Sequence, residues 1–210
     1  RLLHEHLGAA GIPVYGPRPA TLRETVAGRA LLALLRLSDG EFRRDGVAEL
    51  LATAPIRERV GGAAVPGPLW DRISCLANVV GGVDQWHTRL ERYREDRETE
   101  LARRATEAGT LFADVVDRQG EAARRLDAFV AELAAAVQPP SGGWTSLAAW
   151  SVELLDRYLA PRASDGTPWP SGEIDAFDRV RERVGALAQL DDLGAPVSTV
   201  TFLRAVDDEL

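Results

Sequence analysis

Six arginines gather in one stretch of the chain, "HTRLERYREDRETELARR". They are Arg89, Arg92, Arg94, Arg97, Arg103 and Arg104. Guanidinium groups bind phosphate oxygens through paired N–H donors, and nearby Trp86 and Tyr93 offer ring faces on which bases can stack. Four glutamates alternate with the arginines and offset their charge locally, which is typical of an ion-paired, solvated helix surface. That surface is the simpler interpretation, and DNA contact by the six arginines is the functional one.

Trp169 is the tryptophan best placed for an exposed contact. It lies between two prolines in "APRASDGTPWPSG" (160–172), the longest segment rich in helix-breaking residues. Loops of this composition run over the surface and often carry binding residues. The other tryptophans are expected to pack between helices. Trp169 therefore joins the candidate DNA contacts.

The histidines and the single cysteine predict neither a metal site nor a nucleophile. His4 and His6 lie two residues apart, so on a helix they point away from each other and cannot bind one ion together. His87 has no neighbouring ligand residue. Cys75 lies among the apolar positions of its helix, and we expect it to be a small buried side chain.

Clusters of carboxylates occur in residues 173–178, 191–192 and 207–209. These positions fall at the ends of expected helices, where carboxylates stabilise helix N-termini or face water. Their spacing does not match a calcium-binding loop. We therefore predict no catalytic, metal or cofactor site in this chain.

Lysine is absent from the sequence, and all 25 basic residues are arginines. A P-loop needs a lysine at the β- and γ-phosphates, and Schiff-base catalysis needs a lysine amine. A nuclease centre of the PD-(D/E)XK type also needs a lysine beside its carboxylates. These three chemistries are excluded. The formal net charge of −7 argues against binding nucleic acid over the whole surface, but it leaves a local arginine contact open.

Length and composition favour a folded domain without a membrane anchor. The chain has 210 residues, of which 45% are hydrophobic and 27% are charged, so it can bury a substantial core. No apolar run approaches the ~20 residues that span a bilayer, and no secretion signal is recognisable. The single cysteine favours a reducing compartment, so we expect a cytoplasmic location. The lack of methionine suggests a piece of a longer protein.

Apolar periodicity predicts a mainly α protein. Apolar residues at three- and four-residue steps indicate helices near 26–38, 44–54, 69–80, 84–109, 111–137, 146–158, 174–190 and 199–206. We expect an irregular multi-helix domain of about seven to nine helices, with at most a short strand near residues 12–15. Gly120 is a point where the helix over 111–137 is expected to bend or break.

Two local expectations concern the middle of the chain. The helix after residue 68 is expected to bury Leu69, Ile73 and Leu76, with Trp70 as a further candidate. Asp84 is the expected N-cap of the next helix, because its side chain can accept a hydrogen bond from a free backbone N–H.

The first quarter of the chain resembles a known family. "LLHEHLGAAGIPVYGPRPATLRETVAGRALLALLRL" followed by "FRRDGVAELLATAPI" is similar to UvrD/RecB-like superfamily 1 helicases, and most of all to AddB-like, RecB-family exonuclease polypeptides of GC-rich bacteria. In that family a RecA-like lobe gives way to a long helical insertion, the 2B subdomain. The resemblance implies that residues 1–20 are the edge of such a lobe and that 21–210 are the helical accessory domain.

The resemblance also implies a function, which is a role in DNA double-strand-break repair and recombination. The parent protein would be an ATP-dependent helicase/exodeoxyribonuclease, and this part of it would support DNA binding or contacts with a partner helicase/nuclease subunit. ATP and Mg²⁺ would belong to the parent and not to this region. The alternative is a helical protein-interaction or ligand-sensing domain, such as the effector domain of a transcriptional regulator. The oligomeric state stays open.

Overall fold

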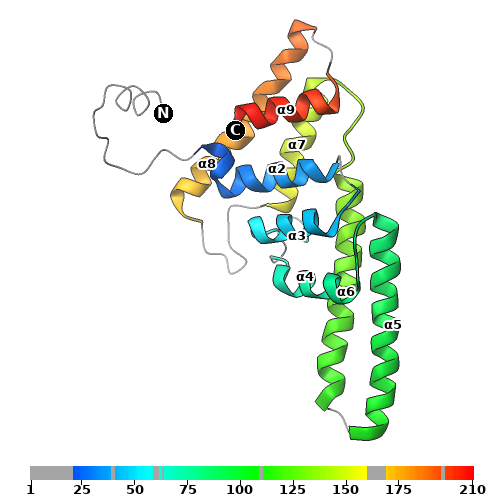
Figure 1. The fold of residues 1–210 in the computed structure, drawn as a ribbon. Helices are drawn as coiled ribbons and strands as arrows, with labels where there is room; N and C mark the ends of the chain where they lie inside the picture. Colours follow the sequence, from blue (N-terminus) through cyan, green and yellow to red (C-terminus); the bar gives the residue numbers. More distant parts are fainter. Residues whose placement is uncertain are drawn as a thin grey trace, which may run out of the picture.

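A computed structural model describes residues 21–38, 41–58, 62, 64–108, 111–159, 169–194 and 197–210, without the side chains of 104–117. Within these ranges the chain forms eight α-helices, two 3₁₀-helices and no strand, which confirms the mainly α prediction (Figure 1). The strand expected near 12–15, and the whole segment 1–20, lie outside the described residues. The elements are η1 (Leu22–Glu24), α2 (Val26–Ser38), α3 (Arg44–Thr53), α4 (Gly67–Leu76), α5 (Val83–Ala108), α6 (Leu111–Ala136), α7 (Trp144–Tyr158), α8 (Ser171–Ala186), η2 (Leu187–Leu193) and α9 (Thr199–Glu209).

Helix α2 is the centre of the body. The sequence "VAGRALLALLRLS" places small and large apolar residues on nearly every side of the helix, and a helix that is apolar all round is buried. Helices α3, α7 and α8 pack around it, and η1 lies against it. The sequence predicted an amphipathic helix here, yet Leu32, Ala33 and Leu37 are buried as well as the expected apolar stripe.

Gly28 allows η1 to lie directly against α2. A Cβ atom at this position would come within 2.0 Å of the carbonyl oxygen of Leu22, so any side chain would push η1 away. The backbone N–H of Arg23, in η1, donates to the carbonyl of Leu210 at 2.9 Å. The Arg23 guanidinium also pairs with Asp207 at 3.1 Å. The first and last described segments therefore meet at one place.

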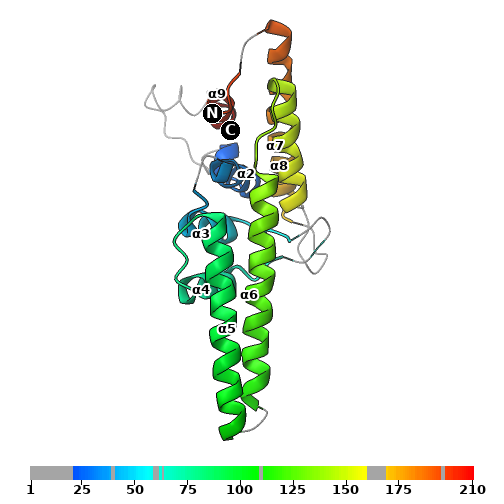
Figure 2. The ribbon, with the colours of Figure 1, turned by 90° about the vertical axis from the view of Figure 1, so that its right-hand side faces the viewer.

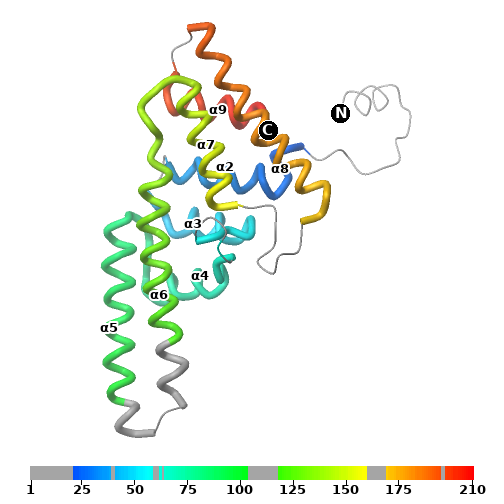
Figure 3. Tube along the Cα trace, turned by 180° about the vertical axis from the view of Figure 1, so that it is seen from behind, coloured from blue at the N-terminus to red at the C-terminus, as the bar shows by residue number. Residues whose placement is uncertain are grey.

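A long helical hairpin projects from this body. Helices α5 and α6 run antiparallel to each other, and the far end of the hairpin extends well beyond α4 (Figure 2). Each helix has 26 residues and is roughly 39 Å long at 1.5 Å per residue. Helix α6 continues through Gly120, so the expected break does not occur there. Seen from behind, α6 runs from the hairpin to the level of α7 (Figure 3). We call the α5–α6 hairpin the arm.

Aromatic side chains attach the arm to the body. The ring of Phe129, in α6, lies 5.1 Å from the ring of Trp70 in α4 and 6.1 Å from that of Tyr158 in α7. At the base of α5, the indole N–H of Trp86 donates to the carbonyl of Phe42 at 2.8 Å. All five of these side chains are buried. The expected packing of tryptophans between helices is confirmed for Trp70 and Trp86.

Helix α4 turns a different face to the core from the one predicted. Trp70 and Ile73 are buried, whereas Leu69 and Leu76 are partly exposed. Two faces of this helix carry apolar residues at helical spacing, and periodicity cannot choose between them. The larger indole ring occupies the core position against Phe129. Cys75 is exposed, so the expectation of a buried cysteine is also wrong.

Two carboxylates cap the N-termini of helices far away in the sequence. Glu173, in α8, accepts a hydrogen bond from the backbone N–H of Val26 at the start of α2, at 2.9 Å. Asp191, in η2, accepts from the N–H groups of Trp144 and Thr145 at 2.9 and 2.8 Å. Free N–H groups at a helix start carry partial positive charge, which favours a carboxylate there. Glu173 and Asp191 thus have the capping role expected of carboxylates at helix ends, although on helices other than their own.

Helix starts elsewhere agree only in part with the sequence. Ser198 caps α9 by accepting from the N–H of Thr201 at 3.1 Å. Helix α5 begins at Val83, so Asp84 lies in its first turn and is not the N-cap. A carboxylate in the first turn still interacts favourably with the helix dipole.

Replacing Asp191 by alanine is expected to lower the thermal unfolding midpoint, because the first turn of α7 loses its cap. Hydrogen bonds from Thr145 are the main cause that holds the pKa of Asp191 below its ordinary 3.8. The contribution of the ionised group is therefore complete above pH 3.8 and is lost as the pH falls through the lowered folded-state pKa. Thermal unfolding followed by circular dichroism at several pH values measures the difference.

The matched control is Asp192→Ala, which removes the neighbouring exposed carboxylate that forms no hydrogen bond with the described residues. It is expected to leave the midpoint nearly unchanged. Equal losses in the two variants would contradict the capping role of Asp191.

Replacing Tyr158 by phenylalanine is expected to leave the free energy of unfolding unchanged or to raise it by up to about 1 kcal/mol, because the mutation removes a buried hydroxyl that has no hydrogen-bond partner. Burial also raises the pKa of Tyr158 to about 12. Denaturant titration measures the change. Tyr93→Phe is the control, since the Tyr93 hydroxyl donates to Gln119 at 3.3 Å and its loss should cost about 0.5–1.5 kcal/mol. A larger loss of unfolding free energy in Tyr158→Phe than in Tyr93→Phe would contradict the interpretation that the Tyr158 hydroxyl is buried without a partner.

Candidate nucleic-acid interface

Arg89 and Arg92 are the two predicted arginines that stand free on the arm. They lie one turn apart on α5 and share one flank of the helix with Gln85, because residues at steps of three and four are neighbours on a helix. Both side chains are exposed, and neither has an ion pair or side-chain hydrogen bond with the described residues. Their guanidinium groups are therefore available to an anion outside the protein.

Arg94 and Arg97 point in other directions. The guanidinium of Arg97 lies over the ring of Tyr93, 5.3 Å from its centre, in a cation–π contact. The Nε atom of Arg94 is buried and has no hydrogen-bond partner. Both side chains are half-buried, so neither presents its full guanidinium group to a ligand outside the protein.

Arg103 pairs with a carboxylate of its own helix. Its Nε and Nη2 atoms donate to the two carboxylate oxygens of Glu100, each at 3.0 Å, in a two-pronged ion pair. The side chain of Arg104 lies outside the described residues. The six arginines therefore do not form one patch: the ion-paired interpretation holds for Arg103, and the free guanidinium groups are those of Arg89 and Arg92.

The aromatic residues predicted to stack on bases are not available for stacking. Trp86 is 1% exposed and Tyr93 is 7% exposed, because both lie between α5 and the rest of the protein. Trp169 is half-buried and packs edge-on against Phe177 of α8, with 6.5 Å between the ring centres. A DNA contact on this surface would therefore use guanidinium groups and phosphates, without base stacking.

His87 joins the two helices of the arm on the side opposite to the free arginines. Its Nδ1 atom lies 2.9 Å from a carboxylate oxygen of Asp127 in α6, and Glu91 lies 4.0 Å from its other ring nitrogen. Hydrogen bonding to Asp127, followed by the charge of that carboxylate, raises the pKa of His87 above 6.5. No local sequence pattern indicates this pair, because the two residues come from different helices.

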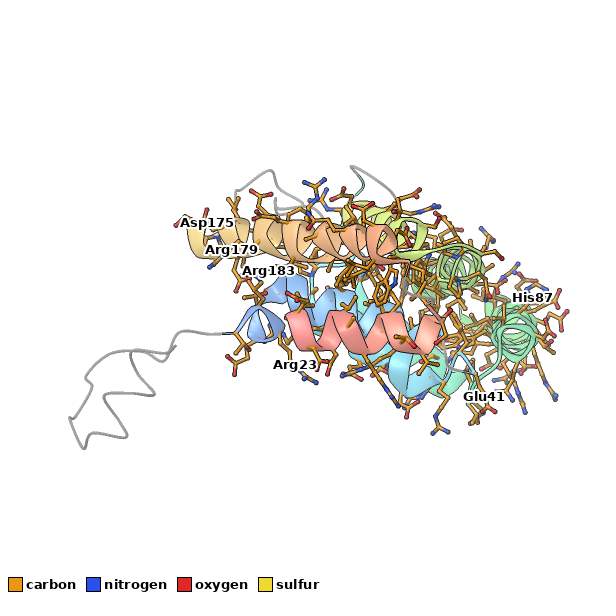
Figure 4. The ribbon with its side chains drawn as sticks, turned by 90° about the horizontal axis from the view of Figure 1, so that it is seen from above. Arg23, Glu41, His87, Asp175, Arg179 and Arg183 are labelled. Atoms are coloured by element: carbon orange, nitrogen blue, oxygen red, sulfur yellow. The ribbon has the colours of Figure 1, made fainter. Side chains whose placement is uncertain are left out.

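A groove that the sequence did not predict lies between α2 and α9. It has a volume of about 470 Å³ and is lined by Arg23, Leu32, Leu35, Arg36, Val200, Leu203, Arg204, Asp207 and Asp208. Arg23 and Asp207 pair across one side of it. Figure 4 shows Arg23 beside α9, far from His87 on the arm. The groove depends on how α9 packs against α2, so no local sequence pattern marks it.

The described residues hold no group of three His, Cys, Asp or Glu side chains close enough together to bind a metal ion. In the same part of the chain, no helix is both long and apolar enough to cross a membrane. Comparisons with protein-family models, curated proteins and solved structures found no match.

The His87–Asp127 pair predicts a stability that depends on pH. Because the folded-state pKa of His87 is raised, protonated His87 stabilises the arm fully below pH 6.5, and this contribution is lost as the pH rises through the folded-state pKa. We expect the thermal midpoint of the protein to fall over this interval, and Asp127→Asn to remove most of that fall. Nuclear magnetic resonance titration of the His87 ring should give a higher pKa in the unmodified protein than in the variant.

Glu91→Gln serves as the control, because Glu91 is farther from His87 and is the weaker influence on its pKa. It should shift the His87 titration less than Asp127→Asn does. A His87 pKa at or below 6.5 in the unmodified protein would contradict the pairing.

Proposed function

We propose that residues 21–210 act as the helical accessory domain of an ATP-dependent helicase/exonuclease-like protein in DNA double-strand-break repair, and that the arm contacts DNA. The observation that carries the proposal is the projecting α5–α6 hairpin with Arg89 and Arg92 unpaired on one flank. Both arginines lie in the first half of α5, the half nearest the body, and their exposed guanidinium groups can pair with phosphates of a duplex that lies alongside it.

A further observation supports the proposal. The residues that resemble the helicase family, up to Ile56, include α2 and α3, which form much of the core of the body.

The charge distribution determines what kind of DNA contact is proposed. The net charge of −7 repels DNA over most of the surface, so binding must be local and must weaken as salt is added. Arg89 and Arg92 would pair with phosphates of the backbone, which carry no sequence information. The arm would then help to hold or position the duplex, and ATP and Mg²⁺ would be bound elsewhere in the parent protein.

A ligand-sensing domain is the second candidate, and the groove between α2 and α9 is the observation that favours it. Its volume falls in the range of small-molecule sites. Four apolar side chains line it together with five charged ones, whereas ligand pockets are usually lined mainly by apolar side chains. The resemblance in the first quarter of the chain and the projecting arm favour the accessory domain.

The DNA contact is tested by Arg89→Gln/Arg92→Gln in fluorescence anisotropy titrations with duplex and forked DNA. Binding is expected to weaken for every sequence alike, and the slope of log K against log salt should fall by about 1.8, since each duplex phosphate contact contributes about 0.9. The charge change itself alters long-range attraction, so the control must carry the same change.

Arg179→Gln/Arg204→Gln is that control, because both arginines are exposed and lie off the arm on α8 and α9. Figure 4 shows Arg179 at the opposite side of the molecule from His87 of α5. If both double variants lose DNA affinity equally, the loss is due to the change in net charge and not to a contact made by Arg89 and Arg92. Absent or salt-insensitive binding by the unmodified protein at low ionic strength would refute direct DNA contact.

A further inference from the structure

Four exposed apolar side chains follow one another along the chain from α4 to the start of α5. Leu69, Leu76, Val80 and Val83 are 38%, 46%, 67% and 38% exposed, and we call these four side chains the strip. Only two other large apolar side chains among the described residues are exposed to this degree, Leu193 and Val200. Clusters of exposed apolar side chains on soluble proteins mark contact surfaces, because leaving them in water costs free energy.

An unpaired guanidinium group lies within this strip. Leu69, Arg72 and Leu76 follow one another at steps of three and four residues, so they form one row on α4. Arg72 is exposed and has no ion pair or side-chain hydrogen bond with the described residues. Its acidic neighbour Asp71 is already paired with Arg44 at 2.6 Å, so Asp71 does not offset the charge of Arg72.

The backbone of Val80 is held to the flank of α5 that carries the free arginines, whereas Val83 lies on the opposite flank of that helix, in the row of His87. The side chain of Gln85 accepts hydrogen bonds from the backbone N–H groups of Val80 and Gly81, at 2.7 and 3.0 Å. Gln85, Arg89 and Arg92 occupy one row of α5, at steps of four and three residues. Unpaired guanidinium groups therefore lie within the strip and just beyond it, and the first acid in the α5 row is Asp96, one turn past Arg92.

We propose that this strip is the docking surface for an acidic, amphipathic helix of a partner protein. Leucine-like side chains of the partner would cover Leu69, Leu76, Val80 and Val83, and its carboxylates would pair with Arg72. An amphipathic helix laid against an apolar surface is a common mode of recognition, and charges at its edge set the choice of partner. This inference goes beyond the proposed DNA contact and does not depend on it.

Charge and chemistry favour a protein segment over the other occupants. DNA phosphates would satisfy Arg72 but would leave the four apolar side chains without a partner. In a symmetric pair of copies the same surface meets itself, which would bring two copies of the unpaired arginines together. A helix that carries both apolar side chains and carboxylates would cover the apolar side chains of the strip and also pair with Arg72.

The test uses the native cysteine as a reporter. Cys75 is the only cysteine in the chain, is exposed, and precedes Leu76, so an environment-sensitive fluorophore can be attached beside the strip alone. The probe is a synthetic peptide of roughly 20 residues, long enough to form a helix, with leucines on one face and glutamates on the other. A peptide with lysines in place of the glutamates tests the charge requirement.

We expect saturable binding of the glutamate peptide with a blue shift of the fluorophore, and weak or no binding of the lysine peptide. Leu69→Ser/Leu76→Ser should weaken binding about tenfold, since the remaining exposed area of two leucines is no longer covered. Arg72→Glu should weaken binding of the glutamate peptide and strengthen that of the lysine peptide. Leu193→Ser/Val200→Ser is the matched control and should bind as the unmodified protein does.

Three results would overturn the proposal. The two peptides could bind equally well, or the control could lose as much affinity as Leu69→Ser/Leu76→Ser. Sedimentation could instead show self-association that the Leu69→Ser/Leu76→Ser change abolishes, which would assign the strip to a second copy of the chain. Duplex DNA binding should be unchanged in Leu69→Ser/Leu76→Ser, so a failure of this proposal is distinguishable from a failure of the DNA contact.

Discussion

The contact of Phe129 with Trp70 and Tyr158 fixes how the arm stands on the body. Helix α6 contributes one half to the core and the other half to the arm, and Phe129 is the point at which α4 and α7 hold it. Buried aromatic side chains of this size are each worth several kcal/mol, about 3–5 on truncation to alanine. A helix held at this point by two neighbours has a defined direction relative to the body.

Charged side chains are abundant on this protein, and ion pairs occupy only part of them. Ion pairs between exposed side chains contribute little to stability, so their main effect is to occupy guanidinium groups that would otherwise be available. Arg103 is occupied by Glu100, and Arg44 by Asp71. Arg72, Arg89 and Arg92 are exposed and unpaired on α4 and α5, and Arg29, Arg118 and Arg204 are so on α2, α6 and α9, within the described residues.

Sequence reasoning was most reliable where a helix is long and its ends carry turn residues. It predicted the helices close to their observed bounds. In α4 it was right for Ile73 and Trp70 and wrong for Leu69 and Leu76, because two apolar faces compete there and Trp70 takes the core position against Phe129. It was also wrong in treating the six arginines as one group, because the direction in which each side chain leaves the helix, and the partner it meets, depend on α6.

The sequence by itself determined the secondary structure, the central apolar helix and the exclusion of lysine chemistry, because these follow from residue type and spacing along one segment. The tertiary structure decided which charged side chains cap a helix, which form ion pairs and which stay unpaired. Glu173 and Asp191 cap helices far away in the sequence, and His87 meets Asp127 only because α5 and α6 run side by side. Such pairings depend on distances between segments, which local periodicity does not encode, and Arg72, Arg89 and Arg92 are among the guanidinium groups that they leave unpaired.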